Sequence, residues 1–395
     1  MFKYRLYPNK NQITILTEQL ELCRQTYNWL LSSHRRTYED TGKTLTQFDL
    51  NNSLIFLKQQ KTDMTKIYAQ VLQNISKRIK DGYTNFFARR KAGLKAGLPR
   101  FKKIGQYKSI TYPQYGFKVV GNKLCLSKIG DIKIRLHRPL RGQTKTLTIK
   151  QRPSGKWYAV FSCVVETQSK EKPHKDIGID VGLNTYATLS DETRIENPRL
   201  YRKSEKKLAK LQKTLSRKKK GSNNRNKARI KVAQLHEKTE NRRTDFLHKA
   251  SRNIADMYET VYVEDLKIKN LVRNHCLAKS ISDAGWNTFT YMISYKAENA
   301  GGRLVKVDPR NTTQNCSQCG ERVEKTLSDR THDCPHCGLV MDRDLNAALN
   351  ILARGREIGR GPPEYMPVGE ETNTQFSVVE QAASMNQEVS LPVGR

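Results

Sequence analysis

The segment "DIGIDVGLN" (Asp176–Asn184) decides the fold, because it has the form of a buried strand that ends in an acid. Its apolar residues lead into Asp180, and Gly182 then marks a turn. A carboxylate beside an apolar core is costly unless it has a hydrogen-bonding partner or holds a cation. The sequence therefore predicts that Asp180 has such a partner or holds a metal ion.

Length and charge narrow the class of protein. A chain of 395 residues is long enough for two to four domains. Its 72 Lys and Arg exceed its 38 Asp and Glu, so the net charge is 72 − 38 = +34. Such a charge attracts polyanions, and nucleic acid is the expected partner. We find no run of eighteen apolar residues and no export signal, so we expect a soluble protein without a membrane partner.

The first 170 residues combine strand and helix patterns. "MFKYRLYP" alternates polar and apolar residues and indicates a strand that Pro8 ends. Residues 12–90 follow a helical period, and short alternating runs return over residues 109–166, with "RPSGKW" as a hairpin turn. A small β-barrel explains this order if its first strand is the N-terminus and the helices are inserted after that strand.

The stretch 202–252 is the most basic part of the chain. It contains nineteen Lys or Arg and four Asp or Glu, an excess of 19 − 4 = 15 positive charges. Apolar residues recur at helical spacing on both sides of "KKKGSNN", so two packed helices joined by a turn are expected. We expect nucleic acid to contact this hairpin, at Arg217, Lys218, Lys219 and Lys220 in particular. The alternative is a solvated helical hairpin without a ligand.

The same half of the chain contains further strand and helix signals. "TVYVEDL" is a second apolar strand that ends in an acid, Glu264. A helix is expected near Ser282–Asn299, a strand at "RLVKVD", and a helix in "MDRDLNAALNIL".

Four of the eight cysteines form a metal-binding pattern. Cys316 and Cys319 are followed after fourteen residues by Cys334 and Cys337, and each pair precedes a glycine. Two such knuckles place four thiolates around one Zn²⁺, and a site with no open position is structural rather than catalytic. The alternative is four free or redox-active thiols. Clustered thiols in a long chain also favour a reducing, cytoplasmic setting.

The acids suggest catalysis. Asp180, Glu264 and either Asp342 or Asp344 lie at strand ends or at the start of a helix that follows a strand. Singly, such an acid is more often a turn or cap residue. Together they match the needs of phosphodiester hydrolysis, in which carboxylates converge to hold two Mg²⁺ ions. A bound cation would also explain why Asp180 ends a buried strand.

Several motifs occur in an order that resembles a known family. "GIDVGLN", "VEDL", "SISDAGW", the double CxxCG and "DRDLNAALNI" look like those of the TnpB family of transposon-encoded RNA-guided DNA endonucleases, which is related to the type V CRISPR effectors. The resemblance reaches to about Arg354. It implies an α+β multidomain fold with a β-barrel wedge domain, an inserted helical recognition lobe, a ribonuclease H-like (RuvC) α/β nuclease domain and an inserted zinc ribbon.

The resemblance also implies the boundaries of these parts. They are a wedge β-barrel (1–12 and 105–170), a helical recognition lobe (13–104), a RuvC-like nuclease domain (173–315 and 339–355) and a target-nucleic-acid-binding zinc ribbon (316–338). Beyond the resemblance, residues 356–395 are expected to form a disordered acidic tail, because from Gly361 onwards the chain contains five Glu, one Arg and several Gly and Pro.

The resemblance further implies roles for individual residues. The catalytic, Mg²⁺-binding acids become Asp180, Glu264 and Asp344, where Asp344 is favoured over Asp342 because it directly precedes "LNAA". Gln73, in "VLQNISKRI", is a candidate reader of a short target-adjacent motif, or else an exposed helix residue.

The implied activity is Mg²⁺-dependent, RNA-guided cleavage of double-stranded DNA next to that motif. The guide RNA would come from the transposon end, and the protein would act as a monomer with its RNA, in a prokaryotic cytoplasm and associated with the nucleoid. Three alternatives stay open: an RNA-guided repressor that binds DNA without cutting it, a transposase that joins strands itself, and a basic RNA-binding protein without a guide.

Overall fold

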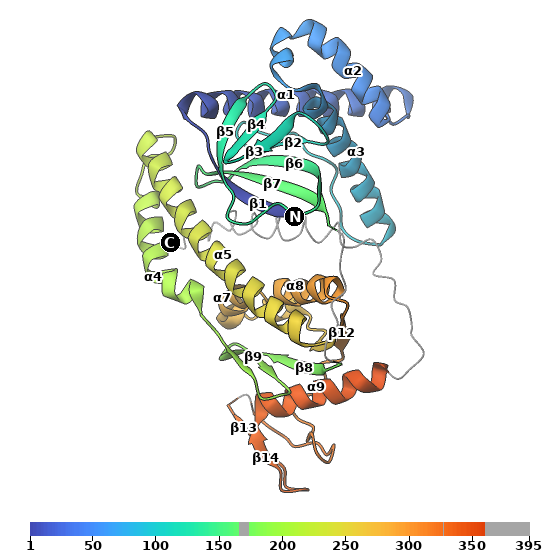
Figure 1. The fold of residues 1–395 in the computed structure, drawn as a ribbon, viewed down its shortest axis with the longest axis vertical. Helices are drawn as coiled ribbons and strands as arrows, with labels where there is room; N and C mark the ends of the chain where they lie inside the picture. Colours follow the sequence, from blue (N-terminus) through green and yellow to red (C-terminus); the bar gives the residue numbers. More distant parts are fainter. Residues whose placement is uncertain (166–173, 327, 360–395) are drawn as a thin grey trace. The chain divides into compact units, whose positions relative to one another are not determined.

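The computed structural model describes residues 1–165, 174–326 and 328–359. The chain forms two compact units, Met1–Glu166 and Thr167–Arg395 (Figure 1). Within the described ranges, none of the helices combines the length and the apolar character that crossing a bilayer requires. The proposed tail lies outside the described residues from residue 360 onwards.

A nearly closed antiparallel sheet forms the core of the first unit. Its strands follow the order β2-β6-β7-β1-β5-β4-β3, so the N-terminal strand lies between β5 and β7. The predicted hairpin turn joins β6 to β7, where the amide of Arg152 donates to the carbonyl of Lys156 at 2.8 Å. The N-terminal strand and the hairpin are therefore confirmed. The strands are β1 (Phe2–Tyr7), β2 (Ser109–Tyr112), β3 (Phe117–Val120), β4 (Lys123–Leu126), β5 (Gly130–Arg135), β6 (Gln143–Gln151) and β7 (Trp157–Val164).

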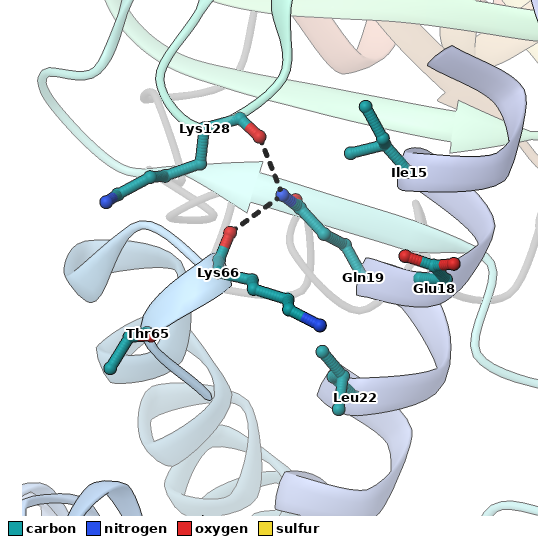
Figure 2. Close-up of a pocket in the computed structure, with 7 residues that line it drawn as sticks. All are labelled: Ile15, Glu18, Gln19, Leu22, Thr65, Lys66 and Lys128. Atoms are coloured by element: carbon teal, nitrogen blue, oxygen red, sulfur yellow. Dashed lines mark hydrogen bonds between the residues drawn. The ribbon is translucent and has the colours of Figure 1, made fainter. Parts of the chain in front are cut away.

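Helices are inserted between β1 and β2, as the sequence predicts. They are α1 (Lys10–Thr41), α2 (Gln47–Gln60), the 3₁₀ helix η1 (Thr62–Lys66) and α3 (Ala69–Lys91). Gln19 of α1 is buried beside an open pocket and joins three segments (Figure 2). Its Nε2 donates to the carbonyls of Lys66 at 3.0 Å and Lys128 at 3.3 Å. These bonds fasten α1 to η1 and to the turn between β4 and β5.

The second unit is built on a five-stranded mixed sheet with the order β10-β9-β8-β11-β12. The central strand β8 is parallel to β11, and β11 is parallel to β12. On the other side, β9 pairs antiparallel with β8, and β10 pairs antiparallel with β9. The strands are β8 (Asp176–Val181), β9 (Thr185–Leu189), β10 (Arg194–Glu196), β11 (Thr260–Glu264) and β12 (Arg303–Val307). The strands predicted at "DIGIDVGLN", "TVYVEDL" and "RLVKVD" are thus confirmed.

The helices of this unit include the predicted basic hairpin, in which α4 packs on α5. The helices are α4 (Leu200–Ser216), α5 (Asn223–Met257), α6 (Ile268–Leu271), α7 (His275–Ala284), α8 (Trp286–Asn299) and α9 (Arg343–Gly359). The prediction of a single helix near Ser282–Asn299 is wrong at its start, because residues before Gly285 belong to α7 and α8 begins at Trp286. Gly285 has φ +65° and separates α7 from α8, because a left-handed residue cannot continue a right-handed helix.

Helices cover both faces of the five-stranded sheet (Figure 1). On one face, Ile177 and Ile179 of β8 and Val261 and Val263 of β11 join a core with residues of α5 and α8. On the other face lies α9. This helix continues to Gly359, past residue 356, where the sequence placed the start of the tail.

The contact between α9 and the sheet depends on two glycines. A Cβ at Gly178 of β8 would lie 2.2 Å from the carbonyl oxygen of Ala348 and 2.7 Å from the amide nitrogen of Leu352. A Cβ at Gly355 of α9 would lie 2.1 Å from the ring of Tyr262 in β11. Any larger residue at either position would push α9 away from the sheet.

A small two-stranded sheet carries the second cysteine pair. It consists of β13 (Thr331–Asp333) and β14 (Val340–Asp342), and Cys334 and Cys337 lie in the turn between them. β14 leads directly into α9, so only this short strand separates the cysteine turn from the helix.

We expect Gly178→Ala to lower the stability of the second unit by about 3 kcal/mol, because the added methyl group meets backbone atoms that cannot rotate away. The thermal unfolding midpoint should fall by roughly 6 to 12 °C in a domain of this size. The control is Gly97→Ala, whose Cβ would meet only the side chain of Arg100 at 3.9 Å. Equal midpoints for the two variants would contradict the close packing of α9.

Candidate active site

Two of the predicted acids lie side by side at the same edge of the sheet. Asp180 is near the carboxyl end of β8, and Glu264 is the last residue of β11. The parallel register pairs Val263 with Ile179, so the next residue on each strand, Glu264 and Asp180, lies at the same level. Paired residues of parallel strands point to the same face of a sheet. Alternation from Gly178 and Tyr262 places both acids on the face that α9 covers.

The third acid comes from α9 itself. Asp344 lies in the first turn of this helix, which packs across β8. Its carboxylate accepts from the guanidinium of Arg343 at 3.0 Å. The start of α9 therefore places Asp344 at the edge of the sheet where β8 and β11 end.

The charges of both other acids affect the pKa of Asp180. Its side chain is buried, and burial raises its pKa well above the usual range. The negative charges of Glu264 and Asp344 raise the pKa further, whereas the positive charge of Arg343 opposes the shift. A cation bound beside Asp180 would relieve this repulsion.

Glu264 is held by a neighbouring hydroxyl. Burial raises its pKa, and the hydrogen bond from Thr312 and the charge of Arg354 oppose this rise. The hydroxyl of Thr312 donates to Oε1 of Glu264 at 2.5 Å. A hydrogen bond to a carboxylate favours its ionised form, so Thr312 keeps Glu264 suited to bind a cation.

The structure separates Asp342 from Asp344. Oδ1 of Asp342 accepts from the amides of Asp344 at 2.9 Å and Leu345 at 3.1 Å, so Asp342 caps α9. Its other oxygen pairs with Arg194 at 3.2 Å. These contacts occupy both oxygens of Asp342.

The four cysteines converge on one point. The Sγ atoms of Cys316, Cys319, Cys334 and Cys337 all lie within 4.8 Å of one another. The Sγ distances from Cys316 to Cys337 and from Cys319 to Cys334 are both 3.6 Å. Tetrahedral bonds of about 2.3 Å to Zn²⁺ would place sulfur atoms about 3.8 Å apart, so the cluster fits this ion. Among the residues that the structure describes, the three acids do not meet the same 4.8 Å spacing.

The backbone around the cysteines has the form of two similar knuckles. The amide of Gly320 donates to the carbonyl of Cys316, and that of Gly338 to the carbonyl of Cys334, both at 2.9 Å. Burial opposes ionisation of Cys316, but nearby backbone amides hold its pKa below the usual range of a thiol. Amides that favour a thiolate also favour metal binding.

The predicted nucleic-acid contacts lie elsewhere. Gln73 is exposed on α3, in the first unit, whereas the acids and cysteines belong to the second. Arg217, Lys218, Lys219 and Lys220 are exposed in the turn between α4 and α5. Arg225 closes this turn by donating to the carbonyls of Leu215 at 3.0 Å and Lys218 at 2.9 Å.

Sequence reasoning missed several polar residues around the acids. Thr312, Arg343, Asn346 and Asn350 either contact an acid or fasten the segment before Cys316. Their one signal in the sequence is position, since they flank the first CxxC or share a helix with Asp344.

The candidate site of this α/β unit thus consists of acids at the carboxyl ends of adjacent parallel strands, a third acid on the helix that covers them and an adjoining four-cysteine cluster. Family models match three parts of the chain: "Probable transposase" over residues 160–275, "Cas12f1-like, TNB domain" over residues 286–351 and "Helix-turn-helix domain" over residues 1–43. Within residues 1–43 the structure contains β1 and one continuous helix, α1, rather than two helices joined by a turn.

Known proteins are similar over nearly the whole chain. A "Putative RNA-guided DNA endonuclease" of Streptomyces pristinaespiralis is 33% identical, over 96% of this chain and 95% of its own. An Escherichia coli K12 protein with the same description, InsQ, is 32% identical, over 90% and 92%. The chain therefore belongs to the TnpB family.

A solved structure shares the fold. The cryo-EM structure of a Cas12f1-sgRNA-target DNA complex contains a chain that matches with a TM-score of 0.53 and 19% identity, over 87% of this chain and 83% of that one. The α+β fold class predicted from the sequence is confirmed.

We expect Asp180→Asn to stabilise the metal-free chain at neutral pH. A raised folded-state pKa means that the stability present below the unfolded pKa of about 4 is lost as the pH rises through the folded pKa. Asparagine removes that loss, which should amount to about 1 to 2 kcal/mol. The unfolding midpoint of the variant should exceed that of the native chain at pH 7.5, and the difference should shrink towards pH 4.

The matched control for this experiment is Asp265→Asn. Asp265 is the next acid after Glu264, and its hydrogen bond with Lys267 lowers its pKa. Its substitution should not stabilise the chain. A lower midpoint for Asp180→Asn at pH 7.5 would contradict the repulsion among the three acids.

Proposed function

We propose that the protein is an RNA-guided DNA endonuclease that cuts DNA by metal-dependent hydrolysis at Asp180, Glu264 and Asp344. The observation that carries the proposal is that the ends of β8 and β11 and the first turn of α9 bring these three acids to one edge of the sheet. The names of the relatives, which describe RNA-guided DNA endonucleases, support this activity. The alternative residue Asp342 is assigned to capping α9.

Asp180, Glu264 and Asp344 would hold Mg²⁺, which prefers carboxylate oxygens. When bound, two such ions activate a water molecule and stabilise the leaving oxygen of a phosphodiester. The protein's own contribution is to fix the ligands: β8 and β11 hold Asp180 and Glu264 at one level, and α9 brings Asp344. Arg343 adds a positive charge beside the acids, where an anionic backbone would approach.

The substrate would be double-stranded target DNA, and the partner would be a guide RNA from the transposon end. The protein would bind both as a monomer. The charge of +34 and the exposed turn Arg217–Lys220 support contact with nucleic acid. The solved relative of the same fold is a complex with a guide RNA and target DNA. Base pairing would read the target sequence, and Gln73 on the exposed face of α3 would read the adjacent motif.

The domain roles belong to the same proposal. The first unit would supply the wedge barrel and the recognition lobe. The second would supply the nuclease domain, split by the zinc ribbon over residues 316–338. A chain with this role would act on the DNA of a prokaryotic cytoplasm.

We expect Asp180→Ala and Asp344→Asn each to reduce Mg²⁺-dependent, guide-matched cleavage by at least about a thousandfold, or some 4 kcal/mol of activation free energy. Each removes a carboxylate from the group. Asp342→Asn should retain most of the activity, because asparagine also caps helices well. The measurement is plasmid cleavage by the purified protein–RNA complex, with guide RNA binding as the control for folding.

Other outcomes identify the alternatives. Discrete RNA and guide-matched DNA binding without cleavage by the native chain would indicate a repressor. Strand-transfer products formed without RNA would indicate a transposase. Binding that depends on salt but not on RNA identity would indicate a basic RNA-binding protein. Greater loss in Asp342→Asn than in Asp344→Asn would exchange the roles of these two acids.

We also propose that the four cysteines hold one structural Zn²⁺. Elemental analysis of the purified chain should find about one zinc per molecule, and Cys334→Ser should lower this ratio and the unfolding midpoint. Cys276→Ser is the matched control, because Cys276 is exposed and lies outside the cluster. An unchanged zinc content in Cys334→Ser would contradict the assignment.

A further inference from the structure

A buried threonine links the segment before the first cysteine pair to Glu264. Thr312 is 2% exposed, and its hydroxyl donates to Oε1 of Glu264 at 2.5 Å. The same hydroxyl lies 3.2 Å from the carbonyl of Pro309. A hydroxyl has one proton to donate, so it can serve only one of these acceptors at a time. The shorter distance and the charge of a carboxylate favour Glu264.

This hydrogen bond leaves one oxygen of Glu264 for other partners. Because Oε1 is engaged by Thr312, the side chain cannot rotate freely about its last bond, and Oε2 keeps a fixed direction. The strand holds the backbone of Glu264, which is in register with Val307 of β12. Backbone and carboxylate are thus both constrained.

Thr312 is itself held by α9. The Nδ2 of Asn350 donates to the carbonyl of Thr312 at 2.8 Å and to that of Asn315 at 2.7 Å. One turn earlier, Asn346 donates to the carbonyl of Asn315 at 2.8 Å and accepts from the amide of Ser317 at 2.9 Å. Asn346 is fully buried.

One turn later, Arg354 fastens the start of the same segment. It donates to the carbonyls of Asp308 at 2.5 Å and Arg310 at 2.9 Å. Positions 346, 350 and 354 are four residues apart, so the three side chains share one face of the helix. The whole segment from residue 308 to residue 317 is therefore clamped to α9.

We propose that Thr312 is a positioning residue that orients the carboxylate of Glu264 for divalent cations. This inference rests on the proposed function and deepens it. The helix that carries Asp344 also holds Thr312, and through it Glu264, so a single element fixes the relative placement of two acids. Groups that orient metal ligands in this way usually change metal affinity or activity by 10- to 100-fold when they are removed.

The test compares Thr312→Val, which keeps the shape but loses the hydroxyl, with Thr312→Ser, which keeps the hydroxyl. The first readout is Mn²⁺ binding to the zinc-loaded full chain without nucleic acid. Binding is measured as the decrease in the electron paramagnetic resonance signal of free Mn²⁺. Binding lost in Asp180→Ala identifies the sites of interest. We expect Thr312→Val to weaken that binding about tenfold and Thr312→Ser to restore it to within about twofold.

The second readout is the Mg²⁺ concentration that gives half-maximal cleavage by the guide RNA complex. It should rise about tenfold in Thr312→Val, with guide RNA binding unchanged. Thr313→Val is the matched control, since it alters the neighbouring threonine, which makes no side-chain hydrogen bond to Glu264 among the described residues. Thr312→Ala, also without a hydroxyl, is measured in parallel with thermal unfolding to separate a folding defect from loss of the bond.

Native-like Mn²⁺ affinity and Mg²⁺ dependence in a folded Thr312→Val or Thr312→Ala variant would overturn the proposal. Equal losses in Thr312→Val and Thr313→Val would overturn it too, because the effect would not depend on the bond to Glu264. Absence of cleavage by the native chain would contradict the proposed function instead, and the Mn²⁺ titration would still decide the role of Thr312.

Discussion

The close contact of α9 with β8 is the constraint on which the second unit depends. Because Gly178 lacks a side chain, the backbone of α9 can approach the central strand of the sheet. That approach places Asp344 next to Asp180, and it brings the polar face of the same helix against the segment that leads to Cys316. A helix a few ångströms farther away would separate the acids and release that segment.

This arrangement places a buried carboxylate, which destabilises the metal-free fold, where it could bind a cation. Asp180 is buried beside two other carboxylates, and in the absence of a cation the folded chain loses stability as Asp180 ionises. Strained or repulsive groups persist where the surrounding structure determines their positions. Here the parallel strands, the cap at Asp342 and the helix contacts supply that determination.

The sequence predicted the elements better than their details. Strand patterns located β1, β8, β11 and β12, since buried strands are apolar and end at recognisable turns. The break at Gly285 escaped notice because one glycine within a helical period does not disturb the period. The hydrogen bonds of α9 could not be predicted, since they join residues that are 29 to 38 positions apart.

The same distinction applies to the site. The four cysteines were identifiable from spacing alone, because the ligands of each knuckle are local. The choice between Asp342 and Asp344 was not settled by the residues themselves. The structure adds that Asp342 accepts from the amides at the start of α9, a contact that no sequence pattern indicates. Thr312 had no distinguishing pattern at all, as a single threonine is common in any loop.

The most direct measurement of the central claim is to reprogram the guide. The RNA that copurifies with the chain would be sequenced, its variable end would be replaced by a new sequence, and the complex would be tested with Mg²⁺ on a plasmid library that contains matches to both versions. We expect discrete RNA and double-strand cuts that move to the new match, next to one short motif. Cuts that stay at the old position, or no cuts at all with bound RNA, would contradict an RNA-guided nuclease.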